Sequence, residues 1–150
     1  MSQSGRCLSE VGAISILENK NVIVGSTSAV TPKYAPSATT FADANATVTV
    51  AQLGTGIFVM TPTAAGRTLT LPTAALVSGY LQQVGESMSF SAVNLGASTD
   101  TVVIAAGTGG TLVGNGTIVD ASTGPGSGMF TIIMTNVTSG SQAYTVTRVA

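Results

Sequence analysis

Short runs with the periodicity of β-strands, separated by turn residues, fill the sequence from residue 46 onward. Four of them alternate apolar and polar side chains: 47–50, 67–71, 87–92 and 143–149. Three are denser apolar runs rich in β-branched or aromatic residues: 56–60, 101–104 and 129–134. A period of two places one set of side chains in a core and the other in solvent. Glycine-containing turns separate the runs, at 65–66, 107–110, 114–116, 124–126 and 139–140. This spacing predicts an all-β fold, an antiparallel β-sandwich or jelly-roll-like barrel.

One short helix is expected within this pattern, at residues 72–77. The hydroxyl of Thr73 can accept a hydrogen bond from a free backbone N–H and so begin a helix, and Gly79 provides a stop. The facing of Ile57, Val59 and Ile133 stays open, because they lie in dense apolar runs. The remaining apolar positions predict this core: Val48, Val50, Phe58, Leu69, Leu71, Leu76, Met88, Phe90, Val102, Ile104, Phe130, Ile132, Met134, Tyr144 and Val146.

Residues 1–44 lack a sustained period and are expected to form an extended N-terminal arm or lead-in to a β-domain at 45–150. Pro32 and Pro36 keep their neighbourhood extended, because proline fixes its own φ and disfavours helix at the preceding residue. The segment either packs irregularly on its own domain or crosses neighbouring subunits as an arm. In the second case its apolar side chains bind the partner: Ile14, Ile16, Leu17, Val22, Ile23, Val24 and Tyr34.

Charged residues make up only 7% of the chain, with 5 basic and 6 acidic side chains among 150 residues, against about 25% in typical proteins. So few charges cannot cover a domain of this size, and the surface is expected to consist of Thr, Ser, Asn, Gly and small apolar groups. Such a surface suits packing against other protein, which predicts self-association, although Thr- and Ser-rich β proteins can also stay soluble as monomers. Five basic residues cannot neutralise many phosphates, so no nucleic acid partner is expected.

The start of the chain lacks the apolar run of a signal peptide, and no apolar stretch approaches the ~18 residues that span a bilayer. Synthesis in a cytoplasm, without a membrane partner, is therefore expected. The single cysteine, Cys7, cannot form an internal disulfide.

The side chains that usually carry catalysis are missing. The chain has no histidine, which removes the usual general base, the partner for a nucleophilic cysteine and the commonest zinc ligand. A carboxylate pair of the glycosidase kind would have to come from six acids expected in loops, strand ends or the arm: Glu10, Glu18, Asp43, Glu86, Asp100 and Asp120. Calcium between strand-end loops could use Asp100 and Asp120, but no dense acidic cluster supports it. The sequence predicts no enzyme activity, no metal and no cofactor.

Five segments, in this order, resemble a known group of proteins: 66–75, 85–94, 104–114, 130–138 and 142–149. They are similar to the β-rich, Thr/Gly/Ala-rich domains of virion proteins of tailed phages and large DNA viruses. The resemblance covers about residues 56–150. It implies a structural virion role as a capsid decoration (cement), minor capsid or fibre-type protein, and it transfers no functional residue.

For a decoration protein, the resemblance implies a homotrimer that clamps neighbouring copies of a major capsid protein on the outer capsid surface. The alternative is a host-binding fibre or tip module that acts as an adhesin. Sugar sites usually include an aromatic platform, and this chain has no Trp and only Tyr34, Tyr80 and Tyr144. A carbohydrate-active enzyme is the third class, which the missing His and Trp disfavour.

Overall fold

The computed structural model describes residues 37–64, 66–97, 99–119 and 126–149. The chain divides into two units, Met1–Tyr34 and Ala35–Ala150, and all described residues lie in the second. They form short strands and two short helices: β1 Ser37–Phe41, β2 Ala46–Thr47, α2 Val50–Leu53, β3 Gly56–Met60, β4 Arg67–Thr70, α3 Ala74–Ser78, β5 Ser87–Asn94, β6 Thr101–Ala105, β7 Gly110–Val113, β8 Thr117–Val119, β9 Gly126–Asn136 and β10 Ala143–Arg148.

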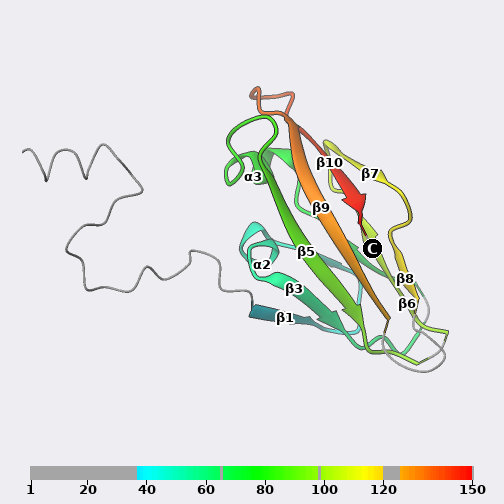
Figure 1. The fold of residues 1–150 in the computed structure, drawn as a ribbon. Helices are drawn as coiled ribbons and strands as arrows, with labels where there is room; N and C mark the ends of the chain where they lie inside the picture. The colour runs from blue at the N-terminus through cyan, green and yellow to red at the C-terminus, as the bar shows by residue number, and fades with distance from the viewer. Residues whose placement is uncertain (1–36, 65, 98, 120–125, 150) are drawn as a thin grey trace, which may run out of the picture. The chain divides into compact units, whose positions relative to one another are not determined.

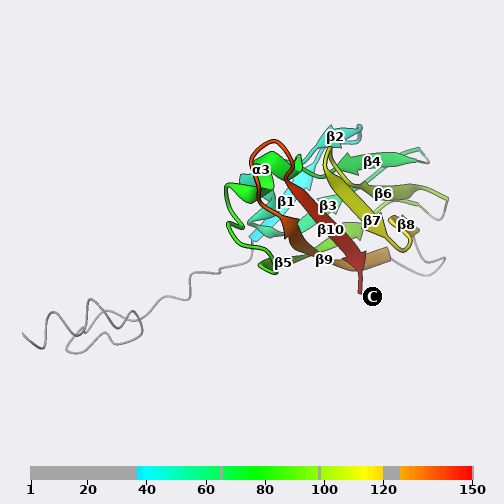
Figure 2. The same cartoon turned by 90° about the horizontal axis from the view of Figure 1, so that it is seen from above.

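The strands form two sheets, one of six strands in the order β1-β3-β5-β9-β10-β7 and one of four in the order β2-β4-β6-β8. Figure 2 shows β4 and β6 on one side of the body and β5 and β9 on the other. The β-rich fold agrees with the prediction, but the antiparallel pairing is wrong. The pairs β1–β3, β3–β5, β10–β7, β2–β4 and β4–β6 are parallel, whereas β5–β9, β9–β10 and β6–β8 are antiparallel. Both sheets are therefore mixed.

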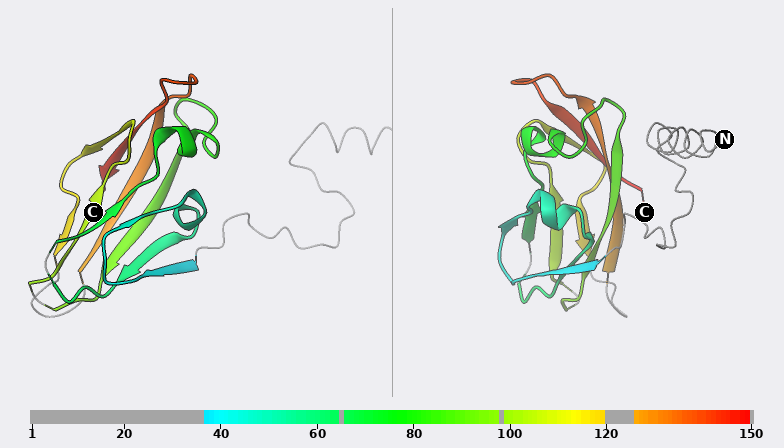
Figure 3. Two further views of the ribbon diagram at one scale, coloured as in Figure 1. Left: turned by 180° about the vertical axis from the view of Figure 1, so that it is seen from behind. Right: turned by 90° about the vertical axis from the view of Figure 1, so that its left-hand side faces the viewer.

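Four of the five parallel pairs, those among β1 to β6, arise because the chain winds repeatedly from one sheet to the other. It passes from β1 to β2, returns through α2 to β3, crosses to β4, returns through α3 to β5, and crosses to β6. Each return brings the chain back to the same end of the six-stranded sheet, so successive strands run in the same direction. Both helices accordingly lie on the same side of the body (Figure 3). The loops that cross between the sheets gather at the other end of the strands (Figure 1).

Each helix begins at a threonine cap. The Thr73 hydroxyl accepts a hydrogen bond from the backbone N–H of Leu76, and the helix ends at Gly79, which confirms the helix expected there. The second helix was not expected from the sequence. The Thr49 hydroxyl accepts from the N–H of Gln52 at 3.2 Å, and the Gln52 side chain accepts from the N–H of Thr49 at 2.9 Å. This reciprocal capping box begins α2, so the run 47–50 is only partly a strand.

A row of phenylalanines forms the centre of the six-stranded sheet's inner face. The chain has 4 phenylalanines, one on each of β1, β3, β5 and β9. Phe58 lies 5.5 Å from Phe41 and 4.8 Å from Phe90, and Phe90 lies 5.4 Å from Phe130, measured between ring centroids. Aromatic pairs at this spacing add to the free energy that their burial already contributes. The row therefore connects four neighbouring strands.

Most of the predicted core is buried in one cluster that contains residues of both sheets. Leu76 was predicted in the core but is 59% exposed, because α3 turns Ala74 and Val77 inward instead. Val50 and Met88 are half-buried. Buried apolar residues that the sequence prediction did not include are Phe41, Leu53, Met60, Ala74, Val77, Leu81, Ala92 and Ile118.

Candidate functional site: a polar loop end and an uncharged sheet face

The side chains predicted to bind a partner all lie outside the described residues: Ile14, Ile16, Leu17, Val22, Ile23, Val24 and Tyr34. Strand β1, at Ser37–Phe41, falls inside the segment expected to be the arm or lead-in and pairs with β3 in the six-stranded sheet.

The carboxylates of the described residues are Asp43, Glu86 and Asp100. Glu86 accepts hydrogen bonds from the backbone N–H groups of Gln82 and Gln83, at 2.6 and 3.2 Å, and so closes a local turn. Within the described ranges, no three His, Cys, Asp or Glu side chains group closely enough to hold a metal ion. Asp120, the second residue of the calcium hypothesis, lies outside these ranges. None of the described helices is long and apolar enough to cross a membrane.

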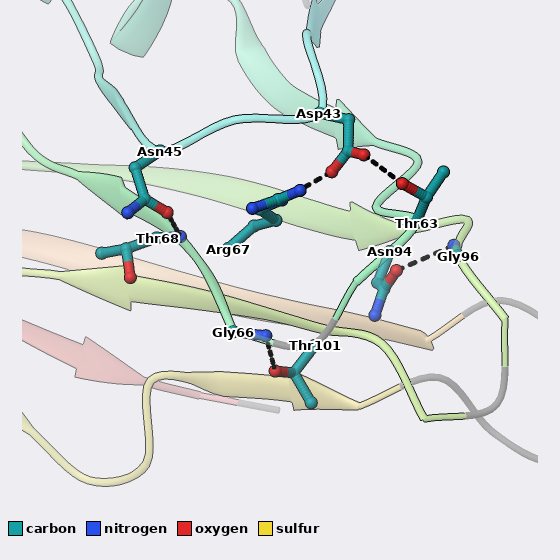
Figure 4. Close-up of polar contacts among 9 residues, drawn as sticks. All are labelled: Asp43, Asn45, Thr63, Gly66, Arg67, Thr68, Asn94, Gly96 and Thr101. Carbon is teal, nitrogen blue, oxygen red and sulfur yellow. Dashed lines mark hydrogen bonds and ion pairs between the residues drawn. The ribbon is translucent and has the colours of Figure 1, made fainter.

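Asp43 lies at the centre of a polar cluster at the loop end of the body (Figure 4). One of its carboxylate oxygens accepts from Nε of Arg67 at 2.6 Å, and the other accepts from the hydroxyl of Thr63 at 2.5 Å. The Arg67 hydrogen bond, followed by that of Thr63, lowers the pKa of Asp43 to about 2. The carboxylate is therefore ionised at neutral pH and already paired. It fastens the loop after β1 to the β3–β4 connection through Thr63 and to the first residue of β4 through Arg67.

Two further hydrogen bonds in Figure 4 connect neighbouring segments at this end. The Asn45 side chain accepts from the N–H of Thr68 at 2.9 Å, and the Thr101 hydroxyl accepts from the N–H of Gly66 at 2.8 Å. The first joins the β1–β2 loop to β4, and the second joins the β3–β4 loop to β6. Both side chains accept from backbone N–H groups in β4 or directly before it, which supports a structural role for the cluster.

Asn94, at the end of β5, is fully buried, and its side chain connects neighbouring segments at the same end of the fold. Its amide nitrogen donates to the backbone carbonyls of Asp100 and Ile118, at 2.8 and 3.2 Å, and its amide oxygen accepts from the N–H of Gly96 at 2.9 Å. A buried amide with these partners avoids the cost of an unpaired polar group. It joins the six-stranded sheet to β8 of the other sheet.

The side of the six-stranded sheet that points away from the core has a different character, and we call it the outer sheet face. It consists of the strand residues that alternate with the buried ones: Ala38, Thr40, Ile57, Val59, Ser87, Ser89, Ser91, Val93, Thr111, Val113, Ser127, Met129, Thr131, Ile133, Thr135, Thr145 and Thr147. None of these side chains is charged. Phe58, Phe90 and Ile132 are buried on the inner side of the sheet. Because successive side chains of a strand point to opposite faces, Ile57, Val59 and Ile133 belong to the outer sheet face.

Within the described strands of this sheet, Arg148 is the only charged residue, and it points inward. It pairs in register with Phe130, and its guanidinium carbon lies 5.9 Å from the centre of that ring. Its Nη1 donates to the backbone carbonyl of Thr117 at 2.7 Å. The guanidinium therefore joins β10 to β8 on the inner side and leaves the outer sheet face without a charge.

Several large apolar side chains are exposed on or beside the outer sheet face. Met129 is 46% exposed, Ile133 39% and Val113 49%, and Val149, whose N–H donates to the carbonyl of Met129, is 60% exposed. The hydroxyls of Ser89 and Thr131 lie 2.8 Å apart in a cross-strand pair between them. The face therefore combines exposed apolar side chains with Ser and Thr hydroxyls, as protein interfaces do.

Comparison of the chain with models of protein families, with curated proteins and with solved structures finds no match. The function is therefore argued from the residues and their geometry.

Proposed function

We propose that this chain is a structural protein that works by packing against copies of itself and against a larger assembly, as a capsid decoration (cement) or minor capsid protein does. The observation that carries the proposal is the outer sheet face, which has no charged side chain across six strands. Surfaces of monomeric proteins ordinarily carry interspersed Lys, Arg, Glu and Asp. A broad face without them suits burial against protein, because no charge has to be removed from water.

The form of the body supports a passive, stabilising role. Its core contains side chains from both sheets, and we take the sheets to be the two layers of a sandwich. The polar side chains at the loop end make hydrogen bonds within the fold. In this proposal the protein is not an enzyme and requires no cofactor.

A decoration protein stabilises a shell because it binds the assembled form and not the free subunits. Each bound copy shifts the assembly equilibrium by mass action, and many identical sites add their effects. A standard contact of about 800 Å² per partner is sufficient at each site. The proposed partner is a major capsid protein, on the outer surface of a virion, after synthesis in the host cytoplasm. The resemblance of residues 56–150 implies a homotrimer.

Residues 1–34 are proposed to extend along neighbouring capsid subunits, with Ile14, Ile16, Leu17, Val22, Ile23, Val24 and Tyr34 as the contacts. The test is co-sedimentation of the protein with empty shells of the major capsid protein encoded in the same genome. The truncated variant should lack residues 1–34 only. Strand β1 begins at Ser37, so a deletion that reached into β1 would also remove its pairing with β3.

The intact protein is expected to pellet with shells. The truncated protein, which keeps every described strand and is checked for cooperative unfolding in urea, is expected to stay in the supernatant. Failure of the intact protein to bind shells would contradict the decoration role. Undiminished binding of the truncated protein would contradict the role of the arm alone.

The second candidate is a host-binding fibre or tip module, which an exposed aromatic side chain supports. Tyr80 follows α3 and is 57% exposed, and two apolar side chains of the same part of the chain, Leu76 and Val84, are 59% and 63% exposed. An exposed ring of this kind can serve as a platform for a sugar. Glycan-array binding that is lost in Tyr80→Ala would support this candidate, and an array without binding would count against it.

A further inference from the structure

We infer that the outer sheet face is the surface on which a second copy of this chain packs, with the two copies related by a twofold axis. The inference rests on the proposed function, because it identifies the surface used for self-association. It goes beyond that proposal in naming the face, the symmetry and the central residues.

The charge pattern selects a second copy as the occupant. A face that carries Lys or Glu repels an identical face unless the charges interlock, and a partner of opposite charge would require charges here for recognition. The outer sheet face carries no charge of either sign, so it does not repel an identical face and offers no charge to a charged partner. Its Ser and Thr hydroxyls both donate and accept hydrogen bonds, so a hydroxyl on one copy can pair with the same hydroxyl on the other.

Strand register places the apolar side chains symmetrically about one point. Met129 and Ile133 lie on β9 on either side of Thr131, which pairs with Ser89 on β5. We place the twofold axis between the facing outer sheet faces of the two copies, perpendicular to β9 and passing over Thr131. This axis brings Met129 of one copy over Ile133 of the other. The reciprocal contact follows from the symmetry, as in any isologous interface.

The size of the face matches what such a pair requires. Six strands about 4.8 Å apart, with about 3.3 Å per residue along β5 and β9, cover a sheet of roughly 600 Å². Side chains enlarge the accessible area beyond this flat value. The result is close to the ~800 Å² per partner of a standard interface. One opposing face of the same size is sufficient to cover it, so the area favours a dimer over the trimer implied by the resemblance.

The test is sedimentation equilibrium of the full chain and two matched variants. Met129→Asp places a carboxylate at the centre of the proposed interface twice, once from each copy. Val119→Asp places the same charge on β8 of the other sheet, where the valine is 61% exposed, and serves as the control. Far-UV circular dichroism establishes that both variants fold.

The wild type and Val119→Asp are expected to be dimers with the same dissociation constant. Met129→Asp is expected to weaken the dimer at least 100-fold, because its charge is buried without a partner. A dimer unaffected by Met129→Asp, a trimer, or a wild-type monomer would each overturn the inference. In a monomer, a loss of stability caused by Met129→Asp alone would assign the face to residues 1–36 of the same chain. Shell binding measured separately tests the proposed function, so a monomer that still pellets with shells refutes only the self-packing.

Discussion

The hydroxyl of Tyr144 connects three segments of the body, and its removal gives the sharpest test of the packing. The residue is 1% exposed. Its hydroxyl accepts from the N–H of Gly107 at 2.8 Å and donates to the carbonyl of Pro72 at 3.0 Å. The space around it is filled, since a Cβ added at Gly110 would clash with the tyrosine ring and one added at Gly107 would clash with the backbone oxygen of Leu71. Strand β10 is thereby fastened to the turn before β7 and to the loop before α3.

Tyr144→Phe keeps the ring and removes both hydrogen bonds. Each backbone group left without a partner in a buried place costs about 1–3 kcal/mol, so for the two groups we expect a loss of about 2–6 kcal/mol in the free energy of unfolding. Typical domains have about 5–15 kcal/mol in total. The control is Tyr80→Phe, which removes a hydroxyl from a residue that is 57% exposed and should change stability by less than about 0.5 kcal/mol.

The assay is urea unfolding followed by far-UV circular dichroism, with all proteins at one concentration because association contributes to apparent stability. Equal unfolding free energies for the two variants would refute the reasoning. A pH series adds a second readout. Burial raises the pKa of Tyr144 above its ordinary value of 10.0, so the folded state keeps this proton to higher pH than the unfolded state does. The contribution of this group to the free energy of unfolding is therefore fully present below pH 10 and is lost as the pH rises through the folded pKa. This component is expected to be absent from Tyr144→Phe.

Three other substitutions follow from the same structure. Phe90→Ala removes the ring that stacks on two neighbours in the phenylalanine row and should cost about 3–5 kcal/mol in urea unfolding; a loss below about 1 kcal/mol would show that the row is not a packed unit. Thr49→Ala removes the cap of α2 and should cost about 1 kcal/mol, whereas Thr47→Ala, on the exposed side of β2, is the matched control and should cost less than half as much. Because its pKa lies near 2 in the folded protein and near 3.8 otherwise, the Asp43 carboxylate contributes stability above pH 3.8 that is lost as the pH falls through 2. Asp43→Asn should lack this acid-dependent component, and identical acid titrations for wild type and variant would contradict the role given to the Arg67 pair.

Periodicity and turn residues were sufficient to predict the β-rich body, most of the core and α3 with its cap at Thr73. Strand direction was not predictable in this way, because side chains alternate identically in parallel and antiparallel strands. The run 47–50 alternates like a strand, but the capping box between Thr49 and Gln52 begins a helix there. Leu76 was misplaced because a single turn of helix gives too few residues to define which side is buried.

The candidate interface was only partly visible in the sequence. The shortage of charge indicated a surface suited to protein contacts, but it did not say where that surface lies. The apolar runs around Ile57, Val59 and Ile133 hide their alternation, and only the register of β3, β5 and β9 shows that these side chains share one face. The polar cluster of Asp43 and Arg67 also depends on the fold, because the two residues lie on segments joined by sheet crossings that local patterns do not reveal.

The central claim is that the chain acts through self-association, and the molar mass of the purified protein in solution tests it most directly. Multi-angle light scattering on a size-exclusion column separates the outcomes, because one copy has a mass of 14.8 kDa. The account predicts a species of at least twice that mass, with the dimer expected from the outer sheet face. A single peak at 14.8 kDa at every loading concentration would contradict it.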